Sequence, residues 1–309
     1  AGGVGRNAFS GTPTTLYPDS FARVPRVGKV TILTRKWRKY TIDLRGKDLS
    51  YVNGGFAWVA NAPNNPNGAT FYLDDIRYNK TRPNDLRFLV SYETLPGPYG
   101  DNFDTILKNV AYTYDNSLAL LAYLARGRKD DLRRAALLAD AFAYAQDHDR
   151  YYDDGRVRNA YQAGDLILPP GWKPNDRVGT ARMPGWWSSD QEQWLEDAGH
   201  AGTTTGNAAW VMIALLRAHQ IVGETRYLEA ARRLGSWIED NNRDSRGDGG
   251  YTGGFDGWEP SPAKLLWKST EHNIDVYIAF MTLSDLLPEP DKASWKERAL
   301  HAKNFVRSM

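Results

Sequence analysis

The sequence contains no cysteine among its 309 residues, and this absence excludes several chemistries. Without a thiol the chain has no disulfide, no thiolate metal site and no cysteine nucleophile. Secretion is not excluded by the absence. Function must therefore be sought among carboxylates, hydroxyls, histidines and aromatic rings.

Long apolar runs and an excess of one charge are also missing. No apolar stretch approaches the roughly 20 residues that span a bilayer. Lys and Arg number 39 against 37 Asp and Glu, and no basic block occurs, which argues against nucleic acid as a partner. With 41% hydrophobic residues the chain is expected to be soluble and globular, with room for two domains. No signal peptide is visible and the first residue is Ala1, not Met, which suits a processed or trimmed chain as well as a cytosolic one.

Aromatic residues are abundant, with 11 Trp and 17 Tyr. Flat rings of this kind pack helices and cores, and they also stack on the weakly apolar faces of sugars. Their number alone does not decide between these two interpretations.

The first 80 residues have a pattern typical of β-strands. Gly, Pro and Asn turns separate β-branched and aromatic segments at 29–34, 38–44, 51–61 and 69–79. This spacing predicts an antiparallel β-sandwich over residues 1–80, although so few strands make only part of one.

The segments "WRKYTIDLRGKDLSYVNGGFAWVAN" and "NPNGATFYLDDIRYN" add a resemblance. They resemble the C-terminal half of a jelly-roll carbohydrate-binding module of the galactose-binding-like type. In such modules an aspartate in the closing strand helps to hold a structural calcium ion, which maps to Asp74 or Asp75. The first strands, which usually supply the other ligands, have no counterpart here.

After a linker at 81–102, the period of the pattern becomes helical through residues 103–309. The periodicity and breakers predict three antiparallel helical hairpins, at 104–126 with 130–148, 204–222 with 224–241, and 270–287 with 291–308.

The three leading helices align without gaps on an asparagine: Asn116, Asn207 and Asn273. Each leading helix is apolar on most faces, as an inner helix should be, whereas each second helix is amphipathic. Alternating inner and outer helices predict a mainly α fold, an α/α toroid of hairpins. A complete six-hairpin barrel needs twelve helices, so we expect half a toroid, completed by further parts of a longer chain or by other subunits.

The long connections 149–203 and 242–269 are expected to gather over the N-termini of the inner helices. Loops collected on one face are where function usually lies. Four stretches should meet at this mouth: "YTYDNS", "NAYQAGDLILPPGW", "RMPGWWSSDQEQWLED" and "GGYTGGFDGWEP" with "KSTEHNID". Their carboxylates, aromatic rings and amides suit a polysaccharide cleft.

Residues 85–309 resemble the six-hairpin glycosidase group of helical-toroid proteins, through "YDN", "TGNAAW" and "STEHNID" in this order. The resemblance implies a carbohydrate-active protein. The resemblance does not specify the reaction, because related toroids include hydrolases, lyases and sugar epimerases.

Glycosidic cleavage needs two carboxyl groups that flank the bond, one of them protonated. Glu271 and Asp115 begin inner helices and are the leading candidates, followed by Asp190 and Asp165 on loops. The alternative for the first two is a helix-dipole contact, which would lower a carboxyl pKa where a general acid needs it raised. Burial, or Asp275 one turn along, would have to overcome that effect.

Further residues are predicted to bind substrate by stacking or hydrogen bonding: Tyr114, Asn116, Trp186, Trp187, Asn207, Tyr251, Trp258, His272 and Asp275. His272 is either a proton shuttle or a hydrogen-bonded structural histidine. A calcium loop at 240–250 is disfavoured, since its sixth position is Ser245 and its twelfth is Tyr251.

The sequence therefore predicts a secreted or cell-surface protein that acts on polysaccharide. The first hypothesis is a glycoside hydrolase of a β-glucan-like chain, with Glu271 as acid and Asp115 or Asp190 as base or nucleophile, and with no cofactor for catalysis. The alternative is a non-catalytic carbohydrate-binding or surface-assembly protein that keeps the toroid as a scaffold.

Overall fold

The computed structural model describes residues 34–40, 63, 65–68, 70–74, 86–95, 102–166, 180–188 and 190–309, and the backbone of 2–4 and 52–54. The chain divides into two compact units, Ala1–Thr81 and Arg82–Met309. Each unit is described by itself.

The N-terminal unit contains one antiparallel strand pair in its described part, β1 (Gly2–Val4) with β2 (Val52–Gly54). The described residues 34–40 and 70–74 are not strands, contrary to the expectation for 38–44 and 69–79. Trp37 is 73% exposed and Tyr72 is 80% exposed, so these segments lack the covering layer that a sandwich strand requires. The other predicted strand residues lie outside the described part.

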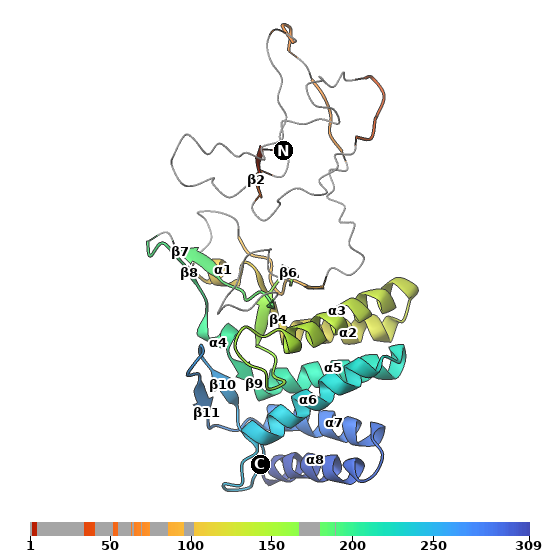
Figure 1. The fold of residues 1–309 in the computed structure, drawn as a ribbon, viewed down its shortest axis with the longest axis vertical. Coiled ribbons are helices and arrows are strands. Elements are labelled where there is room, and N and C mark those ends of the chain that lie inside the picture. The colour runs from red at the N-terminus through yellow and green to blue at the C-terminus, as the bar shows by residue number, and fades with distance from the viewer. Residues whose placement is uncertain are drawn as a thin grey trace. The chain divides into compact units, whose positions relative to one another are not determined.

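The three predicted helical hairpins are confirmed in the second unit. They are α2 (Thr113–Arg126) with α3 (Lys129–Asp147), α5 (Thr205–Val222) with α6 (Thr225–Asn242), and α7 (Thr270–Leu286) with α8 (Asp291–Ser308). Figure 1 shows the three pairs one below another, from α2 and α3 to α7 and α8. No helix in the described residues combines the length and apolarity needed to cross a membrane.

The hairpins form two layers. In the inner layer α5 packs between α2 and α7, and in the outer layer α6 packs on α5 and also touches α3 and α7. One continuous core joins the layers, and its largest buried side chains include Phe142, Leu215, Tyr227, Trp237 and Phe280. The mainly helical, toroid-type fold class is thus confirmed.

The first inner helix begins later than its apolar pattern suggested. A short helix, α1 (Asn102–Leu107), and a strand, β4 (Val110–Tyr112), precede it. β4 pairs with β5 (Ala160–Gln162), and Val110 and Ala160 are both fully buried. Pairing with a distant strand therefore overrides local helical periodicity here.

The long connections contain short antiparallel strands rather than irregular loops alone. β3 (Arg87–Phe88) pairs with β6 (Gly164–Asp165), and β7 (Trp186–Ser188) pairs with β8 (Gln193–Leu195). A three-stranded sheet has the order β11 (Ala263–Leu265), β10 (Gly254–Asp256), β9 (Thr203–Thr204). Because β4 runs directly into α2 and β9 into α5, these strands frame the N-terminal ends of the inner helices, together with α4 (Ala198–Ala201).

One face of the inner layer carries apolar side chains that the described residues do not cover. Leu118 of α2 is 38% exposed, and Ile274 and Ile278 of α7 are 41% and 43% exposed.

Candidate functional site

The aligned asparagines hold the strands to the inner helices. Asn116 accepts from the backbone N–H of Leu89 (2.8 Å) and donates to the carbonyl of Leu89 (3.1 Å) and to that of Tyr112. Asn273 makes the same contacts with Tyr251, at 2.7 and 3.0 Å, and with the carbonyl of Ser269. Both amides are buried, so their hydrogen bonds go to the protein rather than outward.

Asn207 takes part in a different arrangement. Its amide donates to Oδ1 of Asn159 (2.9 Å), which also accepts from the backbone N–H and the hydroxyl of Thr204. Asn159, buried on the loop before β5, thus joins α5 to α4, because its own amide donates to the carbonyl of Gly199.

A line of three side chains crosses the N-terminal ends of all three inner helices. Tyr114 of α2 meets Trp210 of α5 edge to face, with ring centroids 5.3 Å apart. The indole of Trp210 also lies near the carboxyl of Asp275 on α7, close enough to favour the charged form of that carboxyl. Trp210 is thus the link between the helices, although the sequence interpretation passed over it. Its only sequence signal is a large ring three positions after Asn207, where the other inner helices have Ala119 and Val276.

Asp275 has the most altered acidity of the predicted carboxylates. It is 6% exposed, and its Oδ2 atom is buried without a hydrogen-bond partner in the described structure. Burial, and then the nearby charge of Glu271, raise the pKa of Asp275 to about 6, against the opposing effect of the Trp210 indole. A carboxyl group that keeps its proton to this pH can serve as a general acid.

Glu271 and Asp115 lie in the first turns of α7 and α2, as predicted, and Glu271 is exposed. Glu271 lies one helical turn before Asp275, at a spacing that brings i and i+4 side chains together. Asp115 begins a helix that α5 separates from α7. Two interhelical spacings of about 8–10 Å each therefore lie between the axes of their helices.

His272 lies beside this carboxyl pair. Its ring packs 5.3 Å from the ring of Trp267, and it lies so close to Gly206 of α5 that a Cβ there would overlap it. Burial lowers the pKa of His272, with Glu271 opposing the shift, so the ring is neutral at pH 7. Its Nδ1 atom is buried without a partner in the described structure, which fits neither a simple structural histidine nor a solvent-exposed one.

A second polar pair, Tyr112 and His200, lies at the other end of the row and was not predicted. The Tyr112 hydroxyl and Nε2 of His200 are 2.8 Å apart, and the two rings meet edge to face. Burial raises the pKa of Tyr112 to about 12, and the charges of Tyr92, Asp197 and Asp115 add to the shift. Burial also lowers the pKa of His200, whose Nδ1 has no partner among the described residues. The sequence offers one signal for this site: His200 is one of only five histidines, and it lies just before an inner helix.

The remaining loop candidates lie on strands away from this row. Asp165 lies on β6 opposite Arg87 of β3, with an ion-pair distance of 3.6 Å. Trp186 and Trp187 form β7, and Asp190 lies exposed in the turn that follows.

Tyr251 and Trp258 occupy contrasting places. Tyr251 is fully buried in the core, where its hydroxyl donates to Oε2 of Glu239 at 2.6 Å. Trp258 is 50% exposed, and its indole N–H donates to the carbonyl of Glu196 at 3.2 Å. The structure therefore brings Trp258, but not Tyr251, to the loop surface.

A buried ion-pair network fixes the connections around the mouth. Arg158, 1% exposed, binds Asp149 and donates to Oε2 of Glu259 (3.2 Å) and to the carbonyl of Ala201 (2.8 Å). Arg150 binds Glu259 and Glu196. Glu259 of the connection 242–269 thus binds two arginines of the connection 149–203, and these ion pairs hold the two connections together.

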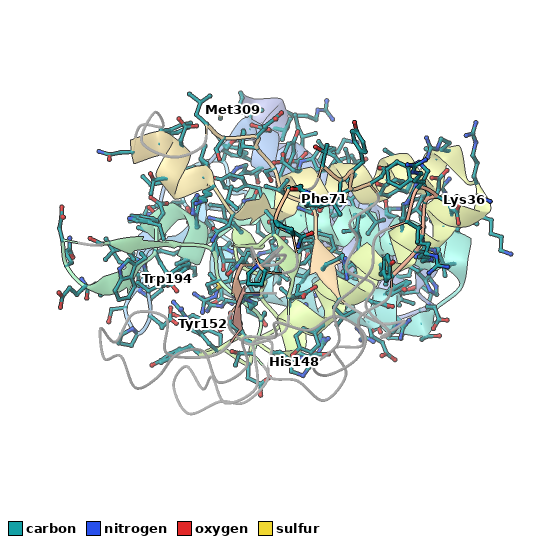
Figure 2. The ribbon with its side chains drawn as sticks, turned by 90° about the horizontal axis from the view of Figure 1, so that it is seen from above. Lys36, Phe71, His148, Tyr152, Trp194 and Met309 are labelled. Atoms are coloured by element: carbon teal, nitrogen blue, oxygen red, sulfur yellow. The ribbon has the colours of Figure 1, made fainter. Side chains whose placement is uncertain are left out.

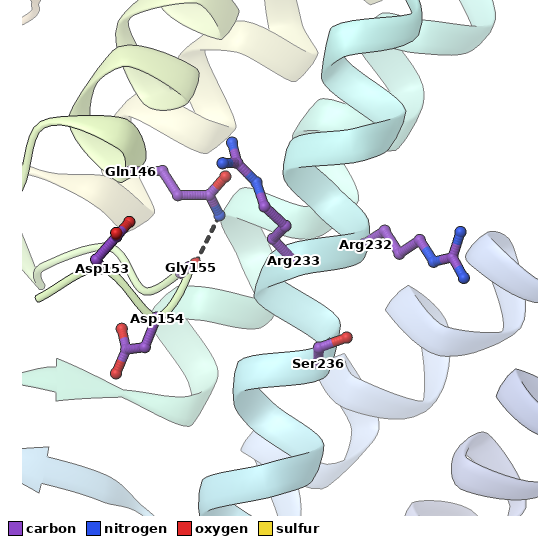
Figure 3. Close-up of a pocket in the computed structure, with 7 residues that line it drawn as sticks. All are labelled: Gln146, Asp153, Asp154, Gly155, Arg232, Arg233 and Ser236. Carbon is purple, nitrogen blue, oxygen red and sulfur yellow. Dashed lines mark hydrogen bonds between the residues drawn. The ribbon is translucent and has the colours of Figure 1, made fainter.

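A shallow pocket on the outer layer has no such chemistry. Figure 3 shows Gln146, whose amide donates to the carbonyl of Gly155 at 2.6 Å, beside Arg232 and Arg233 of α6. Arg232 binds Asp291 and Arg233 binds Asp147, so the pocket is a junction of α3, α6 and a loop.

The predicted calcium position is only partly described. Asp74 is exposed, and Asp75 lies outside the described residues. Across the part of the chain that the structure describes, no group of three or more His, Asp or Glu side chains could hold a metal ion.

No protein-family model matches the chain, and no curated protein sequence does. Among solved structures, the chain is similar to the unsaturated glucuronyl hydrolase of Bacillus sp. GL1, with 16% identity over 70% of this chain and 50% of that chain and a TM-score of 0.44. It is also similar to cellobiose 2-epimerase from Spirochaeta thermophila, with 17% identity over 62% and 42% and a TM-score of 0.42. A family 76 α-mannanase of Bacteroides thetaiotaomicron matches at 15% identity over 63% and 44%, with a TM-score of 0.38. The chain thus spans about half the length of these structures or less.

Proposed function

We propose that the helical unit is a carbohydrate-active enzyme, a glycoside hydrolase, whose proton donor is the Glu271–Asp275 pair. The observation that carries this proposal is a buried, partly unsatisfied carboxyl group beside an exposed one, at the N-terminal end of an inner helix. Glu271 is the member that can touch a sugar. Asp275 keeps a proton to about pH 6 and supplies it to its neighbour.

Asp115 is the second carboxylate in this proposal. Because α5 lies between its helix and α7, a direct pair at the roughly 5–5.5 Å of retaining enzymes is not expected. We assign Asp115 to water activation with inversion at the sugar carbon. This reaction needs the two carboxyl groups about 6.5–9.5 Å apart, so their side chains must reach toward each other across the roughly 16–20 Å between the axes of α2 and α7. The rings of Tyr114 and Trp210, which meet edge to face, lie along the row between the two carboxylates.

The substrate proposed is a polysaccharide, with a β-glucan-like chain as the first to test, and the protein is proposed to be secreted. Exposed tryptophans on the loop side support a sugar ligand, since their flat rings match sugar faces. The uncovered apolar stripe on α2 and α7 supports the expectation that further helices, of the same chain or another subunit, complete the toroid. The calcium ion at Asp74 and Asp75 stays a proposal from the sequence resemblance.

The direct test is reducing-sugar release from barley β-glucan, hydroxyethylcellulose, xylan, yeast mannan and hyaluronan, at pH 5 to 8. Wild type is expected to act on at least one of them, whereas Glu271→Gln and Asp115→Asn are expected to be inactive. Equal activity of wild type and both variants contradicts the assignment. A panel on which even the wild type is inert contradicts hydrolysis and leaves the scaffold alternative.

A second function, proton transfer at a sugar carbon as in an epimerase or a lyase, is favoured by the Tyr112–His200 pair. A neutral imidazole 2.8 Å from a phenol is a suitable base and acid couple for this chemistry. Loss of activity in His200→Gln with retention in Glu271→Gln would identify it.

A further inference from the structure

The hairpin formed by β7 and β8 projects from the helical unit and carries two exposed tryptophans. Trp187 is 61% exposed and Trp194 is 43% exposed, and the strand register places them directly opposite each other. Directly opposed residues of an antiparallel pair lie on the same face, with Cβ atoms about 4.5–5.5 Å apart. Figure 2 shows Trp194 on this arm, away from the helices.

This arm is fixed at its base. Asn109 accepts from the backbone N–H of Gly185 (3.2 Å) and donates to its carbonyl (3.0 Å). A Cβ on Gly185 would overlap both the indole of Trp194 and the backbone of Leu195, so the ring lies directly over the Gly185 backbone. The Trp194 ring is therefore held in place before any ligand arrives, which lowers the entropic cost of binding.

A third exposed tryptophan continues the surface. Trp258, 50% exposed, donates to the carbonyl of Glu196, the residue immediately after β8. Its loop leads through β11 to α7, where Glu271 begins the helix. Trp187, Trp194 and Trp258 are named the tryptophan surface below.

The charge of the arm decides what it can bind. Residues 186–195, "WWSSDQEQWL", contain two acidic residues and no Lys or Arg. An anionic membrane surface or a nucleic acid would be repelled by Asp190 and Glu192. Neutral sugar rings stack on indoles, and their hydroxyls can donate to Asp190 and bond to the exposed amide of Gln191 at the tip.

The turn supplies one more sign of a specialised site. Glu192 has φ 49°, a left-handed conformation that residues other than glycine seldom adopt. Such outliers cluster at ligand-binding segments.

We infer that the tryptophan surface binds an extended, uncharged polysaccharide chain outside the acid site, and so retains long substrates. This inference rests on the proposed function, because it takes the same substrate class. It adds Trp194 as a binding residue and separates binding on the arm from proton transfer at Glu271.

Binding is tested without catalysis by native affinity electrophoresis of the 309-residue chain in gels with barley β-glucan, hydroxyethylcellulose or xylan. Wild type and Asp275→Asn are both expected to be retarded by at least one polymer. Trp187→Ala with Trp258→Ala is expected to weaken retardation about tenfold or more, if each ring contributes roughly 1 kcal/mol. Trp187→Phe, which keeps a ring, should retain most of it.

Phe103→Ala provides the matched control, since Phe103 is 66% exposed on α1 of the same helical unit. Circular dichroism of each variant confirms that it is folded. Unchanged retardation of the double variant, loss in Phe103→Ala instead, or no retardation of the wild type by any polymer each overturns the inference. Failure of the proposed function is distinguishable, because retardation would then persist while no reducing sugar is released.

Discussion

The two ends of the inner helix row carry different acid–base pairs. At the α7 end a buried carboxyl, Asp275, keeps its proton to about pH 6 beside exposed Glu271. At the α2 end a phenol, Tyr112, contacts the imidazole of His200. Burial is the largest cause of the pKa shifts of both Asp275 and His200. Because burial disfavours the charged form, it raises the pKa of the carboxyl and lowers the pKa of the imidazole. The two ends of the row thus hold groups of opposite acid–base character, a carboxyl that retains its proton and an imidazole that loses its proton more readily.

The largest expected effect separates the two ends. Asp275→Asn should lower kcat by about 10²–10⁴-fold, the usual contribution of a general acid, because asparagine cannot supply the proton. His200→Gln, which removes the base at the other end, should change kcat by less than about tenfold. Initial rates on the best polymer of the panel measure both. A larger loss of kcat in His200→Gln than in Asp275→Asn would indicate that catalysis takes place at the α2 end.

The same substitution should raise stability in alkaline solution. The folded pKa of Asp275 is raised above its unfolded value of 3.8, so its protonation favours the folded state fully below that value, and this advantage is lost as pH rises through about 6. Asp275→Asn should therefore exceed the wild type in unfolding free energy at pH 8 by on the order of 1–3 kcal/mol, with little difference at pH 4. Urea denaturation at both pH values measures this, with Asp285→Asn on the same helix as the control. Equal curves at pH 8 would mean that the carboxyl is not buried.

A smaller effect is expected at the α2 end. Tyr112→Phe removes the hydroxyl that meets Nε2 of His200 and leaves that buried nitrogen without its contact. The loss should lower the unfolding free energy by about 1–2 kcal/mol, and this decrease should not be larger at alkaline pH. Tyr114→Phe is the control, since the Tyr114 ring contact with Trp210 does not use its hydroxyl. A gain in stability would indicate that the Tyr112–His200 pair is strained.

The sequence predicts a feature at the two ends of the inner helix row only where the interacting residues are close together in the chain. Helical periodicity and breakers predict all three hairpins, and the gapless alignment predicts that Asn116 and Asn273 are equivalent, because both depend on residues close in the chain. Their shared partner, a backbone N–H and C=O 22 or 27 residues earlier, could not be read from spacing.

The chemistry at the site depends on contacts between distant segments. Trp210 meets Asp275 from 65 positions away in the sequence, and Tyr112 meets His200 from 88. Tyr251 was grouped with the mouth because it sits in a Gly-rich loop, yet Asn273 turns its backbone so that the ring enters the core. Burial is the largest cause of the pKa shifts of Asp275, His272, His200 and Tyr112, and it is a property of the assembled layers rather than of the local sequence.

The finest comparison concerns the coupling within the α7 end. The charge of Glu271 contributes to the raised pKa of Asp275, so Glu271→Gln should lower that pKa, by roughly 0.5–1 unit for neighbours on a partly solvated helix face. The pKa of His272 should also fall, because Glu271 opposes its shift, whereas the pKa of His200 should not move. Carboxyl and imidazole NMR titrations, assigned with Asp275→Asn and His200→Gln, measure all three values in one sample series. A fixed Asp275 pKa in Glu271→Gln would show that burial alone holds the proton, and Glu271 would then be only the group that meets the sugar.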